Sequence, residues 1–440
     1  MICLRNVHLR ARPGLLCALL ATSTLLARSA QAQSTPDAPP APPSSPAAEP
    51  EKPAEATPAP APVAETPKPA AAPETPAAAA PDSLKVIVGG YAEAYYAYNF
   101  NRPENGVTNF RWIDNRHNTF KLQTAVLDVQ AEYGTFQGHI ALQAGPTAEG
   151  WYADSVEARA GASGAASLSA STWKIIQQAT VGWKAPVGKG LLLQAGLFVT
   201  PIGFEGAAVK DNYNWSRSNL FYALPFYHAG VRASYEVAEN LTVAAWLVNG
   251  WNQATDGNDG KSGIAQITYK IPDLLTAQVL YMGGPERAQD SAEGRPFRHL
   301  FDGYAEFYAH KLLSLAVHGD AGFESGAFGT HSWRSGAIYA RAQPLPFLYL
   351  AARGDAFVES VGTDNGGTAS SIFFGSDVYS FTGTIDLRPM DHLSFRTEYR
   401  HDSAQNDIFF KHGSVKDNDG NYAPNADAQD TVTVGVTGWF

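Results

Sequence analysis

The chain has 440 residues, of which 45% are hydrophobic and only 17% are charged, below the roughly 25% charged residues of an ordinary soluble domain. Its formal net charge of -10 gives no basic surface for a phosphate backbone, which argues against nucleic acid as a partner. No window reaches the roughly 18 to 20 uninterrupted apolar residues of a membrane-spanning helix, and a helical membrane protein is therefore excluded.

Residues 1–32 have the features of a secretory signal peptide. A segment with three arginines precedes an apolar stretch over 15–26, and a small-residue box ends at Ala32, where we expect cleavage. Both cysteines, Cys3 and Cys17, lie in this segment. The mature chain would therefore have no disulfide, no thiolate metal site and no cysteine nucleophile.

Residues 33–83 form a low-complexity tract of Pro, Ala, Glu and Thr that holds 16 of the 29 prolines. Such a segment has almost nothing to bury and cannot offset the entropy of ordering, so we expect a disordered extension. As a polyproline II stretch it would reach on the order of 150 Å. The tract is either a simple spacer or an arm that spans the periplasm and contacts peptidoglycan.

From Leu84 to Phe440 the dominant pattern is an alternation of apolar and polar residues. One such segment places Leu313, Leu315 and Val317 in alternation with Ser314, Ala316 and His318. Because successive side chains of a strand point to opposite faces, each segment predicts a strand with one apolar and one polar face. A soluble β-sandwich and a membrane β-barrel would both produce such strands.

The spacing of the breaks between strands separates these two folds. Short turns are predicted at 133–135, 185–189, 238–240, 272–273, 310–311, 343–346 and 389–391. Longer polar loops are predicted at 99–117, 146–172, 201–225, 252–261, 284–298, 323–331, 360–375 and 403–429. Short turns and long loops alternate strictly, which gives sixteen strands, and this is the pattern of bacterial outer-membrane barrels. We therefore predict an all-β, transmembrane, antiparallel up-and-down barrel over 84–440.

The last strand supports a closed barrel. Val432, Val434 and Val436 lie on one face of this strand, and the chain ends at the aromatic Phe440. Pairing of this strand with the strand over 84–98 would remove both sheet edges, as lipid requires. The apolar phase changes within the strand over 118–133, which predicts a bulge near Thr124.

Charged residues on the polar faces would line the lumen, because a charge facing lipid at the bilayer midplane costs roughly 2–4 kcal/mol. The predicted pore-lining residues are Glu93, Arg232, Asp302, Glu306, Asp320, Arg353, Arg396 and Arg400. They could create a transverse field across a water-filled pore, or they could form ion pairs between neighbouring strands. The pattern leaves both interpretations open.

The loop over 201–225 is rich in charged and aromatic residues. It carries Glu205, Lys210 and Arg217, which would lie on a constriction if the loop folds inward, whereas an external loop packed on its neighbours is the alternative. Catalytic signatures are missing: the sequence has no Gly-x-Ser-x-Gly elbow and no His-Glu-x-x-His helix. We expect no enzyme activity, no cofactor and no metal site.

Six short segments carry a resemblance to a known protein family. They are GYAEAYYAYNFNRPENG (90–106), DNRHNTF (114–120), GLFVTPIG (196–203), DNYNWSRSN (211–219), PFYHAGVR (225–232) and NGWN (249–252). These segments resemble the β-barrel porin-2, OmpL-like family, and the resemblance covers essentially all of 84–440. It implies a porin-like barrel in the outer membrane of a Gram-negative bacterium, and it carries over no catalytic or ligand residues.

The sequence thus predicts an outer-membrane porin for passive diffusion of small hydrophilic solutes or ions, because barrels of about sixteen to eighteen strands usually leave an aqueous channel. Outer-membrane lipid is an expected partner, peptidoglycan would be reached through 33–83, and a homotrimer is common among sixteen-stranded porins. Two alternatives remain: a structural barrel that tethers the outer membrane to peptidoglycan, and a barrel hydrolase.

Overall fold

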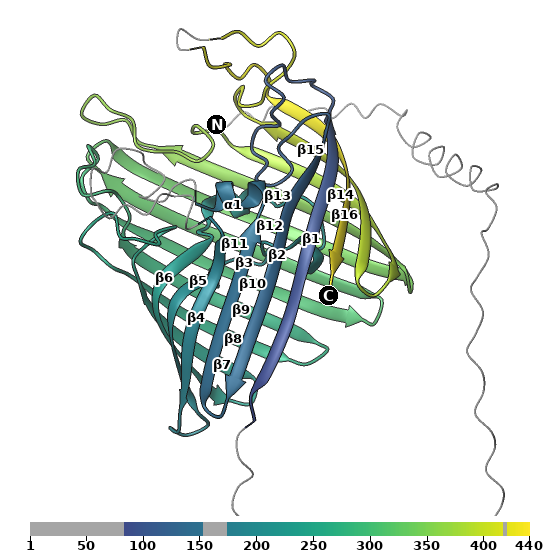
Figure 1. Cartoon of the computed structure of the whole chain (residues 1–440). Coiled ribbons are helices and arrows are strands. Elements are labelled where there is room, and N and C mark those ends of the chain that lie inside the picture. Colours follow the sequence, from purple (N-terminus) through teal and green to yellow (C-terminus); the bar gives the residue numbers. More distant parts are fainter. Residues whose placement is uncertain (1–82, 153–173, 417–419) are drawn as a thin grey trace, which may run out of the picture. The chain divides into compact units, whose positions relative to one another are not determined.

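The computed structural model describes residues 83–152, 174–416 and 420–440. The predicted signal peptide (1–32) lies outside these residues, and so does the predicted linker (33–83) apart from its last residue. The described chain forms a closed antiparallel barrel of sixteen strands (Figure 1), in which consecutive strands pair and β1 pairs with β16. The predicted fold class is confirmed.

The strands differ in length, and several of them are longer than a membrane crossing requires. Their bounds are β1 (Lys85–Asn99), β2 (Thr119–Tyr133), β3 (Phe136–Ala144), β4 (Ile176–Ala185), β5 (Leu191–Val199), β6 (Tyr227–Ala238), β7 (Leu241–Val248), β8 (Ser262–Ile271), β9 (Leu275–Pro285), β10 (Phe297–His310), β11 (Leu313–Gly326), β12 (Gly329–Leu345), β13 (Leu348–Val361), β14 (Val378–Met390), β15 (Leu393–Ala404) and β16 (Ala428–Trp439). The helices are short, namely α1 (Pro146–Trp151), η2 (Val209–Asp211) and η3 (Asn219–Ala223). Within the described residues, no helix is long and apolar enough to cross a membrane.

The alternation of side chains places apolar residues outside and polar residues inside. In β11, Leu315 and Val317 are exposed on the outer face, whereas His318 and Asp320 are buried inside. This is the inverse of a soluble β-sandwich, whose apolar faces are buried between two sheets. An outward apolar face around a closed sheet is suited to hydrocarbon, because neighbouring strands pair around the whole ring and leave no open sheet edge.

The seam between β1 and β16 closes the barrel. Glu93 pairs with Thr437 in this ladder, and the backbone N–H of Gly90 donates to the carbonyl oxygen of Phe440 at 3.2 Å. The register between β1 and β2 shifts after Glu93, where Thr124 and then Leu122 are the paired residues. The bulge predicted near Thr124 is therefore confirmed.

One predicted loop is wrong. The segment 323–331 was expected to be a long polar loop, but only residues 327–328 separate β11 from β12. Phe323 pairs with Ser332, and Gly326 pairs with Gly329, so both strands continue through the predicted loop. Gly329 has φ of 101°, a left-handed conformation that glycine adopts without strain and that permits the tight reversal.

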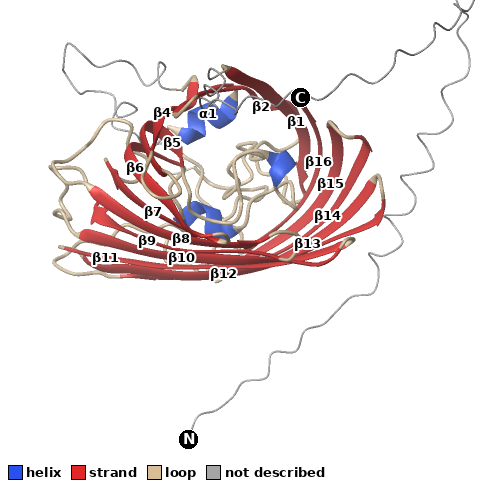
Figure 2. Ribbon diagram, turned by 90° about the horizontal axis from the view of Figure 1, so that it is seen from below, coloured by secondary structure: helices blue, strands red, loops and turns tan. Residues whose placement is uncertain are grey.

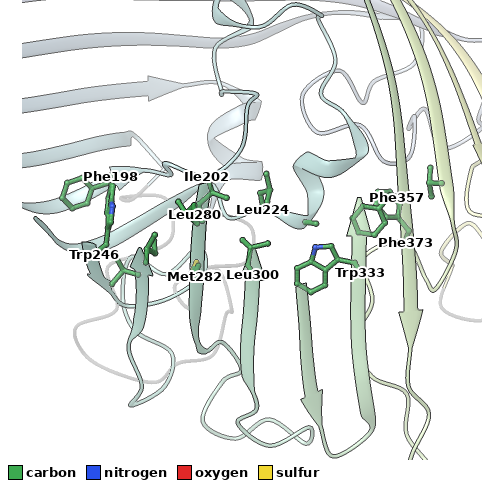
Figure 3. Close-up of a cluster of buried hydrophobic side chains, with 14 of the residues drawn as sticks. Phe198, Ile202, Leu224, Trp246, Leu280, Met282, Leu300, Trp333, Phe357 and Phe373 are labelled. Atoms are coloured by element: carbon green, nitrogen blue, oxygen red, sulfur yellow. The ribbon is translucent and has the colours of Figure 1, made fainter. Parts of the chain in front are cut away.

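A hydrophobic cluster lies on the inner side of the wall, where the alternation predicts polar residues. It includes Trp246 in β7, Met282 in β9 and Leu300 in β10, and these side chains pack with Ile202 and Leu224 of the loop after β5 (Figure 3). The cluster explains why the sequence of β7 is apolar on both faces, because one face belongs to the apolar outer surface and the other belongs to this cluster. The interior of the barrel is therefore partly filled with protein.

Candidate functional site

The loop that connects β5 to β6, residues 200–226, lies inside the barrel, and we call it the inner loop. It contains η2 and η3, and its residues Trp215 and Leu220 are completely buried. Figure 2 shows loop segments and short helices within the ring of strands. Gly203 in this loop has a φ of 91°, a backbone conformation that glycine adopts without strain and that other residues rarely adopt.

Carboxylates on the inner face of the wall accept hydrogen bonds from backbone N–H groups along the inner loop. The contacts are Gly203 N to Asp302 at 3.1 Å, Val209 N to Glu93 at 2.6 Å, Trp215 N and Ser216 N to Glu398 at 2.5 and 2.9 Å, and Asn219 N to Asp355 at 2.9 Å. These acceptors come from β10, β1, β15 and β13, so the loop is fastened at several points around the wall. Charge-assisted hydrogen bonds of this kind are stronger than neutral ones.

Three wall arginines donate to backbone carbonyl groups of the same loop. Nη1 of Arg353 donates to the Ser216 carbonyl at 2.6 Å, Nη1 of Arg396 donates to the Asn214 carbonyl at 3.0 Å, and Nη1 of Arg400 donates to the Arg217 carbonyl. Each of these arginines is only 1% exposed. The charged inner face of the wall thus supplies acceptors for N–H groups of the loop and donors for its carbonyl groups.

These arginines are also paired with carboxylates on the wall. Arg353 lies 3.1 Å from Asp355, Arg396 lies 3.1 Å from Asp386, and Arg400 lies 2.6 Å from Asp402. Of the two interpretations of the lumen charges, the geometry supports ion pairing for these three arginines. The pairing reduces the cost of burying each guanidinium, which would be large for an isolated charge.

Charged residues of the inner loop stabilise its own shape. Glu205 is 2.9 Å from Nη1 of Arg353 and accepts the backbone N–H of Ser218. Burial by itself would raise the pKa of Glu205, but Arg353 and the Ser218 hydroxyl hold this pKa below its ordinary value. Arg217 donates to the carbonyl groups of Gly206, Ala207 and Trp215, and burial lowers its pKa.

The remaining predicted residues have other surroundings. Lys210 pairs with the exposed Asp211 at 2.8 Å, and Glu306 accepts a hydrogen bond from the Tyr213 hydroxyl at 2.5 Å. Arg232 lies over the Trp246 ring, with 4.9 Å to the ring centroid. Asp320 accepts from Trp333 Nε1 at 3.0 Å and from the Ser335 hydroxyl at 2.6 Å, so it contacts the wall and not the inner loop.

A second loop, between β1 and β2, also reaches into the barrel. Its Arg111 lies 3.4 Å from Asp402 and 3.6 Å from Asp114, and both side chains of the Arg111–Asp114 pair are nearly completely buried. Trp112 of this loop stacks on Phe226 of the inner loop, with 4.9 Å between ring centroids. The two loops therefore pack on each other inside the barrel.

Two residues important for the inner loop have no distinguishing signal in the sequence. Glu398 is one of many inward charges, yet it accepts two N–H groups of the loop. A Cβ atom at Gly435 of β16 would lie 2.3 Å from the Trp215 ring, so the absence of a side chain there makes room for the loop. The fold places both residues next to inner-loop residues that lie more than 180 positions away in the sequence, so neither contact has a local sequence signal.

A closed sixteen-stranded barrel with an apolar outer face and a loop folded into its lumen defines the class of outer-membrane porins. The chain belongs to the family described as "Putative beta-barrel porin-2, OmpL-like", whose model matches residues 85–438. This confirms the family that the sequence resembles. The protein is thus an outer-membrane channel protein, and family and fold are those of a non-enzymatic pore.

Solved structures of bacterial outer-membrane proteins share the fold. A trimer form of OmpT from Vibrio cholerae has 10% identity and a TM-score of 0.53, and the match covers 82% of this chain and 100% of that chain. An anion-selective porin from Comamonas acidovorans has 11% identity and a TM-score of 0.51, with coverage of 81% and 100%. The channel DcaP of Acinetobacter baumannii also has 11% identity and a TM-score of 0.51, with coverage of 81% and 97%. No curated protein matches the chain.

Proposed function

We propose that the protein is a passive diffusion channel for small hydrophilic solutes or ions in which the inner loop forms the constriction. The observation that carries this proposal is the fastening of the loop backbone to wall charges on several strands. A loop held at many points keeps a fixed position in the lumen, so it would narrow the passage without moving in and out of it. Glu205, Lys210 and Arg217 would then lie at the constriction.

The predicted pore-lining residues have two roles in this proposal. Arg353, Arg396 and Arg400 hold the loop in place, because their guanidinium groups are buried against its carbonyl oxygens. Arg232 and Glu306 are only half-buried and would contact the solute path. Family and fold favour this channel over the tethering barrel and the barrel hydrolase.

We further propose that the long loops face the outside and the short turns face the periplasm, as in bacterial outer-membrane barrels. Lys85 begins β1 at the short-turn end, so the tract 33–83 would extend into the periplasm, where peptidoglycan is within its reach. The trimer form of OmpT makes a homotrimer our proposal for the assembly.

Swelling of proteoliposomes in sugars of increasing size tests the channel directly. Vesicles that contain the protein purified from outer membranes should swell fast in arabinose and slowly in the tetrasaccharide stachyose, because the inner loop restricts the passage. Vesicles with the protein boiled before reconstitution are the control. Equal, slow rates for both preparations would contradict a diffusion channel.

A further inference from the structure

A polar cavity of about 540 Å³ lies at the long-loop end of the barrel. Its lining comes from the loop between β7 and β8, the loop between β9 and β10, the loop between β13 and β14, and strands β10 and β12. Tyr222 of the inner loop is also part of the lining, so the cavity adjoins the constriction that we propose. The volume lies within the roughly 300–1,000 Å³ of pockets that bind small molecules.

Aromatic rings form one part of the lining. Trp251 and Trp333 meet edge to face, with 6.4 Å between their ring centroids, and the Arg298 guanidinium lies 5.0 Å from the Trp251 ring centroid. Trp333, labelled in Figure 3, is 5% exposed, whereas Trp251 is only partly buried. Trp251 is therefore the indole that is open to a ligand in the cavity.

The charged groups of the cavity are held in place by one another. Arg287 donates to both carboxylate oxygens of Glu324 at 2.8 and 3.0 Å, and Arg298 donates to the same carboxylate at 2.7 Å. Arg287 also lies 3.4 Å from Glu293. Glu324 and Glu293 thus compensate the charges of the two guanidinium groups, and the cavity has no surplus positive charge that would attract an anion.

The groups that remain for a ligand include both donors and acceptors. Arg298 uses Nε and Nη2 for Glu324, which leaves Nη1, and the Ser371 hydroxyl is exposed. Glu286 is oriented by the backbone N–H of Trp251 at 2.7 Å and by the Ser262 hydroxyl at 2.6 Å, and each of its oxygens can accept a further hydrogen bond. Asp290 is an exposed acceptor.

We propose that this cavity binds a neutral carbohydrate and captures it before it enters the passage beside the inner loop. A hydroxyl group both donates and accepts, so it can use Arg298 and Glu286 together, and the apolar face of a sugar ring can lie against Trp251. An anion would be opposed by Glu286 and Asp290, whereas an ammonium cation, which can only donate hydrogen bonds, could not use the free Nη1 donor of Arg298. This inference rests on the proposed channel function and names its class of solute.

Binding of maltose to the full-length protein purified from outer membranes tests this inference. In planar bilayers, maltose at millimolar concentration should interrupt the ion current in a saturable way, and tryptophan fluorescence of the detergent-solubilised protein should saturate over the same range. Trp251→Ala should raise the half-saturating concentration about tenfold, since truncation of a central aromatic contact has effects of this size. Trp251→Phe, which retains a ring, should lose much less.

Trp183→Ala is the matched control, because Trp183 lies on the outer face of β4 with 52% exposure and should leave maltose binding unchanged. Tighter binding of succinate or putrescine than of maltose would overturn the assignment to neutral sugars. Open channels that maltose neither blocks nor binds would overturn this inference and leave the channel function intact. Saturable fluorescence without any open channel would overturn the channel function and leave the sugar site intact.

Discussion

Arg353 in β13 and Glu205 in the inner loop form a buried ion pair, with 2.9 Å between Nη1 and Oε1. The same Nη1 atom donates to the Ser216 carbonyl, and Nε of Arg353 donates to Asp355. One guanidinium thus joins the wall to two separate parts of the inner loop. Arg353 is therefore one of several wall residues that hold the loop in the lumen.

Glu205→Gln should loosen the inner loop while its side-chain volume is kept. The change removes one partner of a buried ion pair, which costs on the order of 3 kcal/mol of the free energy that docks the loop. We expect larger and noisier single-channel currents and faster cleavage of the inner loop by trypsin. Glu132→Gln is the control, because the Lys85–Glu132 pair is exposed, lies outside the inner loop and contributes about 1 kcal/mol at most.

Gly435→Ala should displace the inner loop by a steric route. The added Cβ atom would lie 2.3 Å from the Trp215 ring, and overpacking of this kind costs roughly 1–3 kcal/mol. The expected result is a lower temperature for loss of the folded barrel on heated gels, together with altered conductance. Gly383→Ala adds a Cβ atom that meets nothing within 4 Å, so this variant should behave like the wild type. Identical behaviour of the two variants would refute the close approach of Trp215 to β16.

Glu306 and Arg341 flank the same residue of the inner loop and should have opposite effects on ion selectivity. Glu306 accepts the Tyr213 hydroxyl at 2.5 Å, and the Arg341 guanidinium lies 4.3 Å from the Tyr213 ring centroid. Both side chains are half-buried, so each can contribute charge to the solute path. In a salt gradient, Glu306→Gln should shift the reversal potential toward anion preference and Arg341→Gln toward cation preference. Shifts in the same direction would show that these residues do not line the path.

Acid should release the inner loop in a defined range of pH. The lowered pKa of Glu205 means that its charge stabilises the folded state fully above the ordinary glutamate pKa of about 4.3, and that this stabilisation is lost as the pH falls through the lowered value. The part of the conductance change that depends on Glu205 should therefore appear only below about pH 4. In Glu205→Gln this acid step should be absent, and an unchanged step in that variant would assign the effect to another group.

The wall of the barrel could be predicted from the sequence because its two environments impose a period of two. In β11, Val317 faces outward and the next residue, His318, faces inward, and this alternation repeats along a strand. The error at 323–331 has a physical cause, since β11 and β12 stay paired through a segment in which few residues are apolar. There a polar strand such as the one around Ser332 has the composition of a loop.

The inner loop could be predicted only in part. Its charged and aromatic composition distinguishes it from an ordinary surface loop. However, Arg396 and Glu398 bind backbone groups of the loop, and because every residue has such groups, the sequence does not show which residues they contact. The apolar inner cluster was not predictable for a similar reason. Met282 lies on the inner face of β9, where Ile202 and Leu224 of the inner loop pack in the same cluster, and the sequence of β9 gives no indication of these partners.

Single-channel conductance in planar bilayers tests the central claim most directly, with the wild type compared with a variant in which residues 206–219 are replaced by a short Gly-Ser linker. Folding of both proteins is checked by the change in gel mobility on heating. An open barrel narrowed by its inner loop predicts stable current steps for the wild type and clearly larger steps for the variant. A folded wild type that stays silent, or steps of equal size in the two proteins, would contradict this account.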